Sequence, residues 1–155
     1  MTKNTIFDAL KQSVLDIYKE DMGYFKYKAG REQSIQFRIA YKMAKVIEPM
    51  YKDLFVDCEP TRCNGQRKIK GKRPDIIVHQ RYKDKKGYLV IEIKCNKRNW
   101  ENDFDKLKQF TNQANDSQNC PTYMMGAFVY LGNTLDKVEI TTFQNGAEYE
   151  VIKGL

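Results

Sequence analysis

Histidine and closely paired cysteines are almost missing from this chain. Of its 155 residues only His79 is a histidine, and four are cysteines. Structural zinc sites use cysteines in short-spaced pairs or several histidines. The cysteines show no such spacing, since they lie at Cys58, Cys63, Cys95 and Cys120. The sequence therefore argues against a zinc protein, and reduced thiols are expected in a chain without a secretion signal.

Long apolar runs and targeting signals are also missing. No hydrophobic stretch reaches the length needed to cross a bilayer, and the first residues, MTKNTIFDALKQ, lack the apolar centre of a signal peptide. We find no internal repeat, linker or low-complexity tail. We therefore expect a single domain over residues 1–155, placed in the cytoplasm and without a membrane partner.

Positive charge is in excess. The formal net charge is +7 and the sequence pI is about 9.1. Such a balance favours polyanionic partners such as nucleic acid, although charge alone supports solubility and nonspecific binding rather than an activity.

The most informative stretch is residues 73–94, RPDIIVHQRYKDKKGYLVIEIK. Two runs rich in Ile and Val, 73–81 and 88–95, are separated by a charged segment that contains a glycine. This pattern predicts a β-hairpin.

Ionisable residues interrupt both apolar strands of this hairpin. Because side chains alternate between the faces of a strand, Glu92 and Lys94 share one face. If Arg81 pairs with Tyr88, Asp75 lies opposite Lys94 and diagonal to Glu92, with roughly 5 to 8 Å between Cβ atoms. Two carboxylates and an amine are then expected to converge.

This convergence is typical of phosphodiester chemistry. Two carboxylates are costly to bury together unless a cation lies between them. Mg²⁺ binds one or two carboxylates, keeps several waters and can accept phosphate oxygens, and Mn²⁺ is a common substitute. A lysine beside the ion can orient a water or neutralise charge on phosphate. The alternative is a structural ion pair, or a hairpin with this face in solvent.

The same residues carry a family resemblance. Pro74-Asp75, followed by Glu92-Ile93-Lys94 after an apolar run, resembles the PD-(D/E)xK or restriction-endonuclease-like superfamily of Mg²⁺-dependent nucleases. Longer strings are similar to small uncharacterised bacterial and phage-type members, namely VDCEPTR, KRPDIIVHQR, LVIEIKCNK and DKLKQFTN. The resemblance spans about residues 31–130.

The resemblance implies roles for five residues. Asp75 and Glu92 would hold Mg²⁺ with the carbonyl of Ile93 as a third ligand, and Lys94 would position the attacking water. Glu32 matches the acidic residue that an N-terminal helix adds to the metal site in some members. The alternative for Glu32 is stabilisation of the first turn of its helix, a common role for glutamate.

Basic residues are candidates for contacts with nucleic acid. We expect the stretch before Asp75 to be a mobile loop that binds phosphates without reading sequence. Its cations are Arg62, Arg67, Lys68, Lys70, Lys72 and Arg73. In the resembled family, the helix after the E-x-K strand often adds a polar or basic residue, which makes Lys106 and Gln109 candidates. Ordinary solvation is the alternative for each.

Periodicity predicts an α/β or α+β fold in the order α-α-β-β-β-α-β-β-β, with a central mixed sheet flanked by helices as in the resembled core. Helix 31–47 is expected to end before Pro49, and Asn145-Gly146 predicts a hairpin turn. The expected helices cover 3–21, as an accessory element, 31–47, and about fourteen residues from Trp100 or Glu101. The expected strands cover 54–59, 73–81, 88–95, 123–131, 137–143 and 147–152.

The leading hypothesis is therefore a Mg²⁺-dependent nuclease that cuts DNA rather than RNA. A homodimer would suit it, because cutting both strands of a duplex needs two sites or two visits. One alternative is a catalytically inactive protein on the same fold that binds nucleic acid or a partner protein. A weaker alternative is a structural subunit that uses the apolar face of the first helix.

Overall fold

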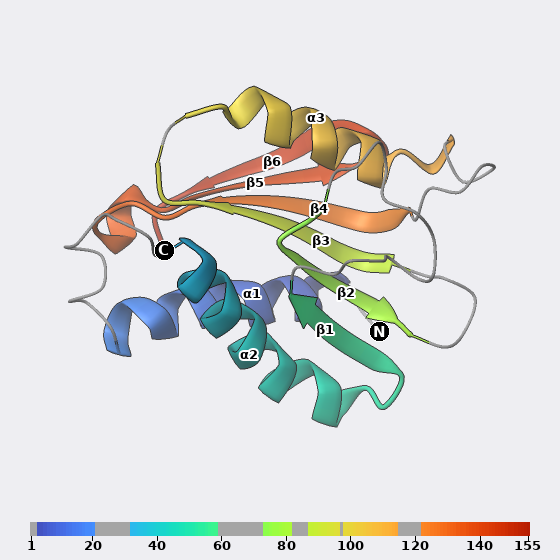
Figure 1. The fold of residues 1–155 in the computed structure, drawn as a ribbon, viewed down its shortest axis with the longest axis horizontal. Helices are drawn as coiled ribbons and strands as arrows, with labels where there is room; N and C mark the ends of the chain where they lie inside the picture. Colours follow the sequence, from blue (N-terminus) through green and yellow to red (C-terminus); the bar gives the residue numbers. More distant parts are fainter. Residues whose placement is uncertain (1–2, 21–31, 59–72, 82–86, 97, 115–121) are drawn as a thin grey trace.

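The computed structural model describes residues 3–20, 32–58, 73–81, 87–96, 98–114 and 122–155. Within these described residues, three α-helices and six strands follow one another in the order that the sequence predicts (Figure 1). The helices are α1 (Lys3–Glu20), α2 (Glu32–Met50) and α3 (Trp100–Thr111). The strands are β1 (Leu54–Cys58), β2 (Ile76–Gln80), β3 (Gly87–Lys94), β4 (Tyr123–Tyr130), β5 (Glu139–Gln144) and β6 (Ala147–Lys153), and a short 3-10 helix, η4 (Leu135–Lys137), precedes β5.

The strands form one mixed sheet in the order β1-β2-β3-β4-β5-β6. Neighbouring strands are antiparallel except for β3 and β4, which run parallel. A parallel pair needs a crossover connection, and α3 provides it. The fold is thus α+β, as predicted, with α3 tied to the two central strands.

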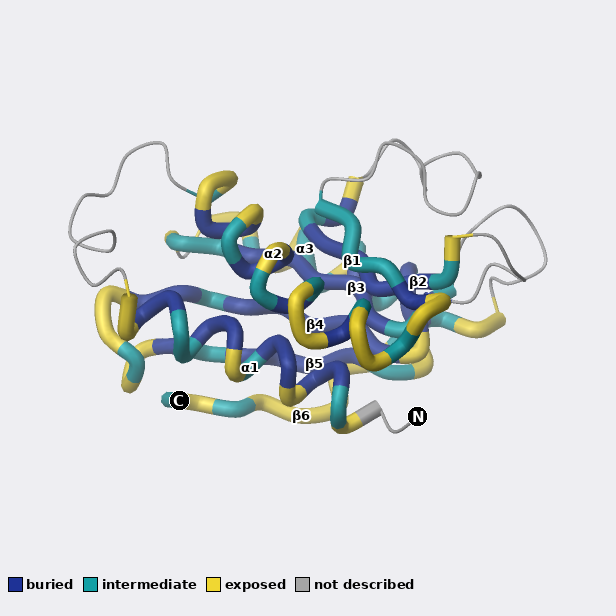
Figure 2. Tube along the Cα trace, turned by 90° about the horizontal axis from the view of Figure 1, so that it is seen from below, coloured by how far each residue is buried: buried dark blue, intermediate teal, exposed yellow. Residues whose placement is uncertain are grey.

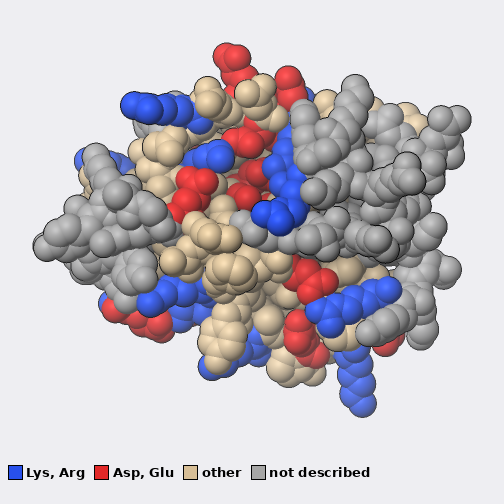
Figure 3. All heavy atoms as spheres, viewed as in Figure 1, with Lys and Arg blue, Asp and Glu red and all other residues tan. Residues whose placement is uncertain are grey.

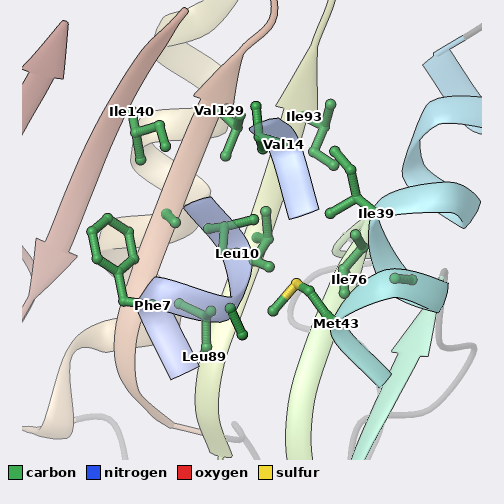
Figure 4. Close-up of a cluster of buried hydrophobic side chains, with 14 of the residues drawn as sticks. Phe7, Leu10, Val14, Ile39, Met43, Ile76, Leu89, Ile93, Val129 and Ile140 are labelled. Carbon is green, nitrogen blue, oxygen red and sulfur yellow. The ribbon is translucent and has the colours of Figure 1, made fainter. Parts of the chain in front are cut away.

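The two faces of the sheet are covered by different helices. Helices α1 and α2 lie against one face and α3 against the other (Figure 1). The apolar face of α1 packs into the larger core, where Figure 4 shows its side chains beside those of α2 and the strands. The labelled core residues are Phe7, Leu10 and Val14 of α1, Ile39 and Met43 of α2, and Ile76, Leu89, Ile93, Val129 and Ile140 of the sheet.

Strand β3 is buried on both faces, which decides the environment of the candidate site. Leu89, Ile91 and Ile93 join the core under α1 and α2, whereas Val90 joins the smaller core under α3. Glu92 follows Val90 by two residues and therefore faces α3 as well. Figure 2 shows the contrast between the buried central strands and the largely exposed edge strand β6. An acidic residue in the middle of β3 is thus enclosed rather than placed in solvent.

Two local expectations have different outcomes. The Asn145-Gly146 turn is confirmed, since both residues have the positive φ angles, 52° and 79°, of a tight hairpin turn. The end of the second helix is wrong, because α2 continues through Pro49 to Met50. Proline removes only its own N–H donor, and the next turn still forms through Tyr51 N–H and the Ile47 carbonyl, 2.9 Å apart.

Among the helices that the structure describes, none combines the length and the apolar character needed to cross a membrane.

Candidate active site

Glu92 and Lys94 occupy the end of the central strand β3 and point toward α3. Their backbone partners on β4 are Phe128 and Tyr130. The Glu92 side chain is only 2% exposed, whereas the Lys94 side chain is 24% exposed. The alternation expected from the sequence therefore holds, and it places a buried carboxylate next to a lysine that reaches solvent.

Asp75 lies immediately before β2 and is attached to β3 through its side chain. Its Oδ2 accepts a hydrogen bond of 2.7 Å from the Ile93 N–H, and its own N–H donates to the Ile91 carbonyl at 3.2 Å. A carboxylate thus takes the place of a carbonyl in the pairing with β3. Asp75 is fixed beside Glu92 by this bond.

The predicted register of the hairpin is wrong by two residues. Ile76 pairs with Ile91, so that Asp75 comes level with Glu92 and not with Lys94. The expectation assumed that Arg81 pairs with Tyr88, whereas the register shifts between Val78 and His79 and His79 pairs with Gly87. Asp75 still lies on the expected face, because a shift of two residues preserves the alternation.

Glu32, at the start of α2, reaches the end of β3. Its Oε1 is 3.4 Å from Lys94 Nζ, and its Oε2 accepts a hydrogen bond of 3.1 Å from the Cys95 N–H. The structure therefore brings this glutamate to the strand that carries the E-x-K sequence, 60 residues further along the chain.

Helix α3 adds one carboxylate that the sequence reading did not single out. Asp103 Oδ2 lies 3.6 Å from Lys94 Nζ, and its side chain is 14% exposed. In the sequence, acidic residues in a first helical turn suggest stabilisation of the helix dipole, which hides this role. The spacing of three residues between Asp103 and Lys106 places both on one side of the helix and was the available signal. We call Glu32, Asp75, Glu92 and Asp103 the carboxylate cluster.

Lys106 contacts the cluster from the same helix. Its Nζ lies 2.6 Å from Glu92 Oε1, with the two side chains 11% and 2% exposed. The pair has the distance of an ion pair, but Oε1 is a buried oxygen that no hydrogen-bond donor among the described residues satisfies geometrically. Figure 3, which views the face seen in Figure 1, shows acidic and basic side chains gathered next to one another in the upper middle of the molecule, near α3.

Both central carboxylates are difficult to ionise in this environment. Burial raises the pKa of Glu92 to about 8, and the charge of Asp75 adds to the effect while Lys106 opposes it. Burial also raises the pKa of Asp75 to about 6, against the hydrogen bond from Ile93 and the charges of the lysines. Two carboxyl groups that resist ionisation side by side are typical of a site that takes up a cation.

The pKa of Lys94 shifts in the opposite direction from that of an isolated buried lysine. Burial alone would lower its pKa, but the carboxylates of Asp103, Glu32 and Asp75 outweigh burial and raise the pKa above its usual value. Lys94 is therefore a cation at neutral pH. A charged ammonium can donate hydrogen bonds and stabilise negative charge, whereas it cannot remove a proton from water.

The donor set fits a hard divalent ion that keeps most of its waters. Among the described residues, no three His, Cys, Asp or Glu side chains form a ready-made metal site. Mg²⁺ does not require three, since it is commonly held by one or two carboxylates together with waters and phosphate oxygens. Asp75 and Glu92 supply these two carboxylates side by side.

The structure describes only some of the remaining residues that were predicted to contact nucleic acid. Gln109 lies on α3 one turn beyond Lys106 and is half-buried, while Arg73 is exposed just before Asp75. The other basic residues proposed for nucleic acid, Arg62, Arg67, Lys68, Lys70 and Lys72, lie outside the described residues.

A second polar group lies on β1 and β2. His79 Nε2 is 2.7 Å from Asp57 Oδ2, and Arg81 also binds the Asp57 carboxylate while lying 4.4 Å from the centre of the Phe55 ring. The hydrogen bond with His79 lowers the pKa of Asp57 to about 2, with help from Arg81 and against burial. His79 is thus a hydrogen-bonding partner of Asp57.

Cys95, which lies just after β3, is a free thiol. Burial raises the pKa of Cys95 to about 11, with a contribution from Glu32. Cys95 is therefore a poor nucleophile, although it directly follows the candidate site.

When the chain is compared with models of protein families, with curated proteins and with solved structures, none of the three comparisons finds a match.

Proposed function

We propose that this protein is a Mg²⁺-dependent nuclease, similar to the PD-(D/E)xK superfamily, that hydrolyses phosphodiester bonds in DNA. The observation that carries the proposal is the meeting of Asp75, Glu92 and Lys94 on one side of β2 and β3. The Glu92 carboxyl group is buried next to the partly buried Asp75, and the Lys94 side chain reaches solvent. This arrangement is the equipment that metal-assisted phosphodiester hydrolysis requires.

The charge of the site supports one divalent ion. When ionised, the four groups of the carboxylate cluster carry four negative charges, whereas Lys94 and Lys106 carry two positive charges. The excess among these described groups is two negative charges. One Mg²⁺ ion would balance it, which explains why carboxylates can be kept together in a buried place.

The chain's own residues then have distinct tasks. Asp75, Glu92 and the Ile93 carbonyl would hold the ion, and the Ile93 N–H fixes the orientation of Asp75 through Oδ2. The ion, when bound, would make a coordinated water more acidic and polarise the phosphate.

Lys94 orients the attacking water and stabilises charge on the phosphate. Its raised pKa favours this task over proton removal. Glu32 and Asp103 keep its ammonium in position from two different helices.

The first prediction concerns cleavage. Purified protein is incubated with plasmid, linear and single-stranded DNA and with RNA, in Mg²⁺, Mn²⁺ or EDTA. We expect cleavage of DNA with either metal and none with EDTA. Asp75→Asn should remove nearly all activity, and Lys94→Ala should lower the rate by roughly 10²–10³-fold, the usual effect of losing one group that stabilises the transition state.

Controls in this assay use α3, where Asp105 is exposed and points away from the cluster. Asp105→Asn should cut like the unchanged protein. Cleavage that persists in EDTA, or in both site variants, would remove the assigned mechanism.

One observation favours a second candidate, a catalytically inactive protein that binds nucleic acid or a protein partner. Lys94 and Lys106 each pair with carboxylates of the cluster, so the site partly neutralises itself without a metal. Binding of DNA without cleavage under any metal condition would support this candidate and contradict the nuclease.

A further inference from the structure

Lys106 occupies an unusual position for a lysine on a helix that faces water along one side. Its neighbours on α3, Leu107 and Phe110, pack against the sheet, and the Lys106 side chain is itself only 11% exposed. Its Nζ lies 2.6 Å from Glu92 Oε1, deep beside the strand. An ammonium group is kept in such a place when an anionic partner compensates for the lost water.

The same carboxylate is one of the two that would hold Mg²⁺. A magnesium ion binds carboxylate oxygens at about 2.0–2.1 Å, so an ion on the same oxygen, Glu92 Oε1, would lie within about 5 Å of the ammonium at its present position. Two positive charges at that separation repel each other strongly where little water screens them. Glu92 Oε1 therefore cannot bind both cations well at once.

The contact between the Lys106 ammonium and Glu92 can also be broken and re-formed. The lysine side chain is a flexible four-carbon stem, and its ammonium needs only a new anionic partner or solvent. Asp103 lies three residues earlier on the same helix, a spacing that allows a lysine to reach a carboxylate. Nothing in the backbone of α3 has to change for the ammonium to move.

We infer that Lys106 is a built-in counter-ion of the ionised Glu92 carboxylate that leaves when a divalent metal ion binds, and that its released ammonium then contacts the phosphate of the substrate. The inference rests on the proposed function and adds to it an order of events: the ion binds, Lys106 moves, and the site gains a cation for the substrate. It also unites two roles of Lys106, the contact with Glu92 in the metal-free structure and the predicted contact with nucleic acid.

Metal affinity tests the first half directly and needs no substrate. Mg²⁺ is titrated calorimetrically into metal-free protein at pH 8.5, where the Glu92 carboxyl is largely ionised. Lys106→Met removes the charge and keeps an unbranched, flexible side chain that is one atom shorter. We expect it to bind Mg²⁺ about tenfold more tightly than the unchanged protein, because no cation has to leave. Lys106→Gln should behave in the same way and guards against a folding defect peculiar to one variant.

Lys108→Met is the matched control, because Lys108 lies on the same helix but pairs with Glu148 at the surface, 3.3 Å away. Its Mg²⁺ affinity should equal that of the unchanged protein. Equal or weaker Mg²⁺ binding by both Lys106 variants would overturn the inference.

A labelling experiment tests the movement in the unchanged protein. Reductive methylation of lysines is followed residue by residue by mass spectrometry, with and without Mg²⁺. Lys106 should react several-fold faster when Mg²⁺ is present, and Lys108 should not change. A Lys106 rate that is unaffected by Mg²⁺ would contradict the release.

These results separate the inference from the proposed function. If the unchanged protein binds Mg²⁺ and cuts DNA while the Lys106 variants show unaltered affinity, only the counter-ion role fails. If neither the unchanged protein nor the variants bind Mg²⁺, the metal-dependent nuclease fails and the inference falls with it.

Discussion

At the scale of single residues, three side chains of the candidate site break a local rule of strand sequences. Asp75, Glu92 and Lys94 interrupt strands that are otherwise apolar, and such an interruption demands a partner or a ligand. Asp103 breaks no rule in a helical first turn, so its place beside Lys94 emerges only from the packing of α3 on the sheet. A contact between segments far apart in the chain leaves no recognisable pattern in the sequence around either residue.

The Glu92 carboxyl group makes the stability of the metal-free protein depend on pH. Its pKa is about 8 in the folded protein against a usual value near 4.5, so the folded state holds the proton more tightly than the unfolded state. This favours folding below about pH 4.5, and the contribution is lost as the pH rises toward 8. Asp75, with a pKa of about 6, acts in the same direction at lower pH.

We therefore expect the unfolding free energy in EDTA to fall by a few kcal/mol between pH 5 and pH 8.5. Glu92→Gln should show a much smaller fall, and the exposed Glu101→Gln should follow the unchanged protein. Urea unfolding at several pH values measures these slopes. Equal slopes for Glu92→Gln and the unchanged protein would show that Glu92 ionises normally.

At the scale of elements, the sequence predicted the type and order of the helices and strands better than their pairing. Apolar periodicity indicated which segments are helices and which are strands, since burial of one face dictates it. The register of β2 and β3 depended on the irregularity between Val78 and His79, which no residue pattern announced. The predicted end of α2 before Pro49 was wrong for a similar reason. The free-energy cost of a proline at the end of α2 is small enough for neighbouring hydrogen bonds to compensate.

The β5–β6 hairpin gives a prediction at this scale. Gly146 has a φ of 79°, which side chains with a Cβ adopt only with strain, and an added Cβ would lie 3.2 Å from Asn112 Cβ. Gly146→Ala should lower the unfolding free energy by about 1 kcal/mol and leave cleavage unchanged, because the turn is not part of the carboxylate cluster.

Thermal or urea unfolding measures the effect of Gly146→Ala. Asn133→Ala, at an exposed position outside the helices and strands, is the control and should have little effect. A variant as stable as the unchanged protein would mean that the turn relaxes to another geometry.

At the scale of the whole molecule, α3 links the crossover and the site. Parallel pairing of β3 and β4 requires a crossover connection, and the helix in that connection, α3, lies over the face toward which Glu92 and Lys94 point. The topology thus places Asp103 and Lys106 of α3 next to Glu92 and Lys94 of β3. The order of elements was predictable from the sequence, whereas this meeting follows only from the folded sheet.

The net charge of +7 gives the last prediction, on binding of DNA as a polyanion. Asp75→Asn, which should bind without cutting, allows the affinity for a DNA duplex to be measured by fluorescence anisotropy between about 50 and 300 mM salt. The logarithm of the affinity should fall linearly with the logarithm of the salt concentration, because binding releases condensed counterions.

Adding Arg67→Ser and Lys68→Ser should reduce the magnitude of that slope by about 2, one for each lost phosphate contact, and weaken binding to all sequences equally. The same two substitutions should leave Mg²⁺ affinity unchanged, since metal binding depends on Asp75 and Glu92. A slope that survives both substitutions would mean that the cations ahead of Asp75 do not contact the DNA backbone, and that the excess positive charge acts from elsewhere on the surface.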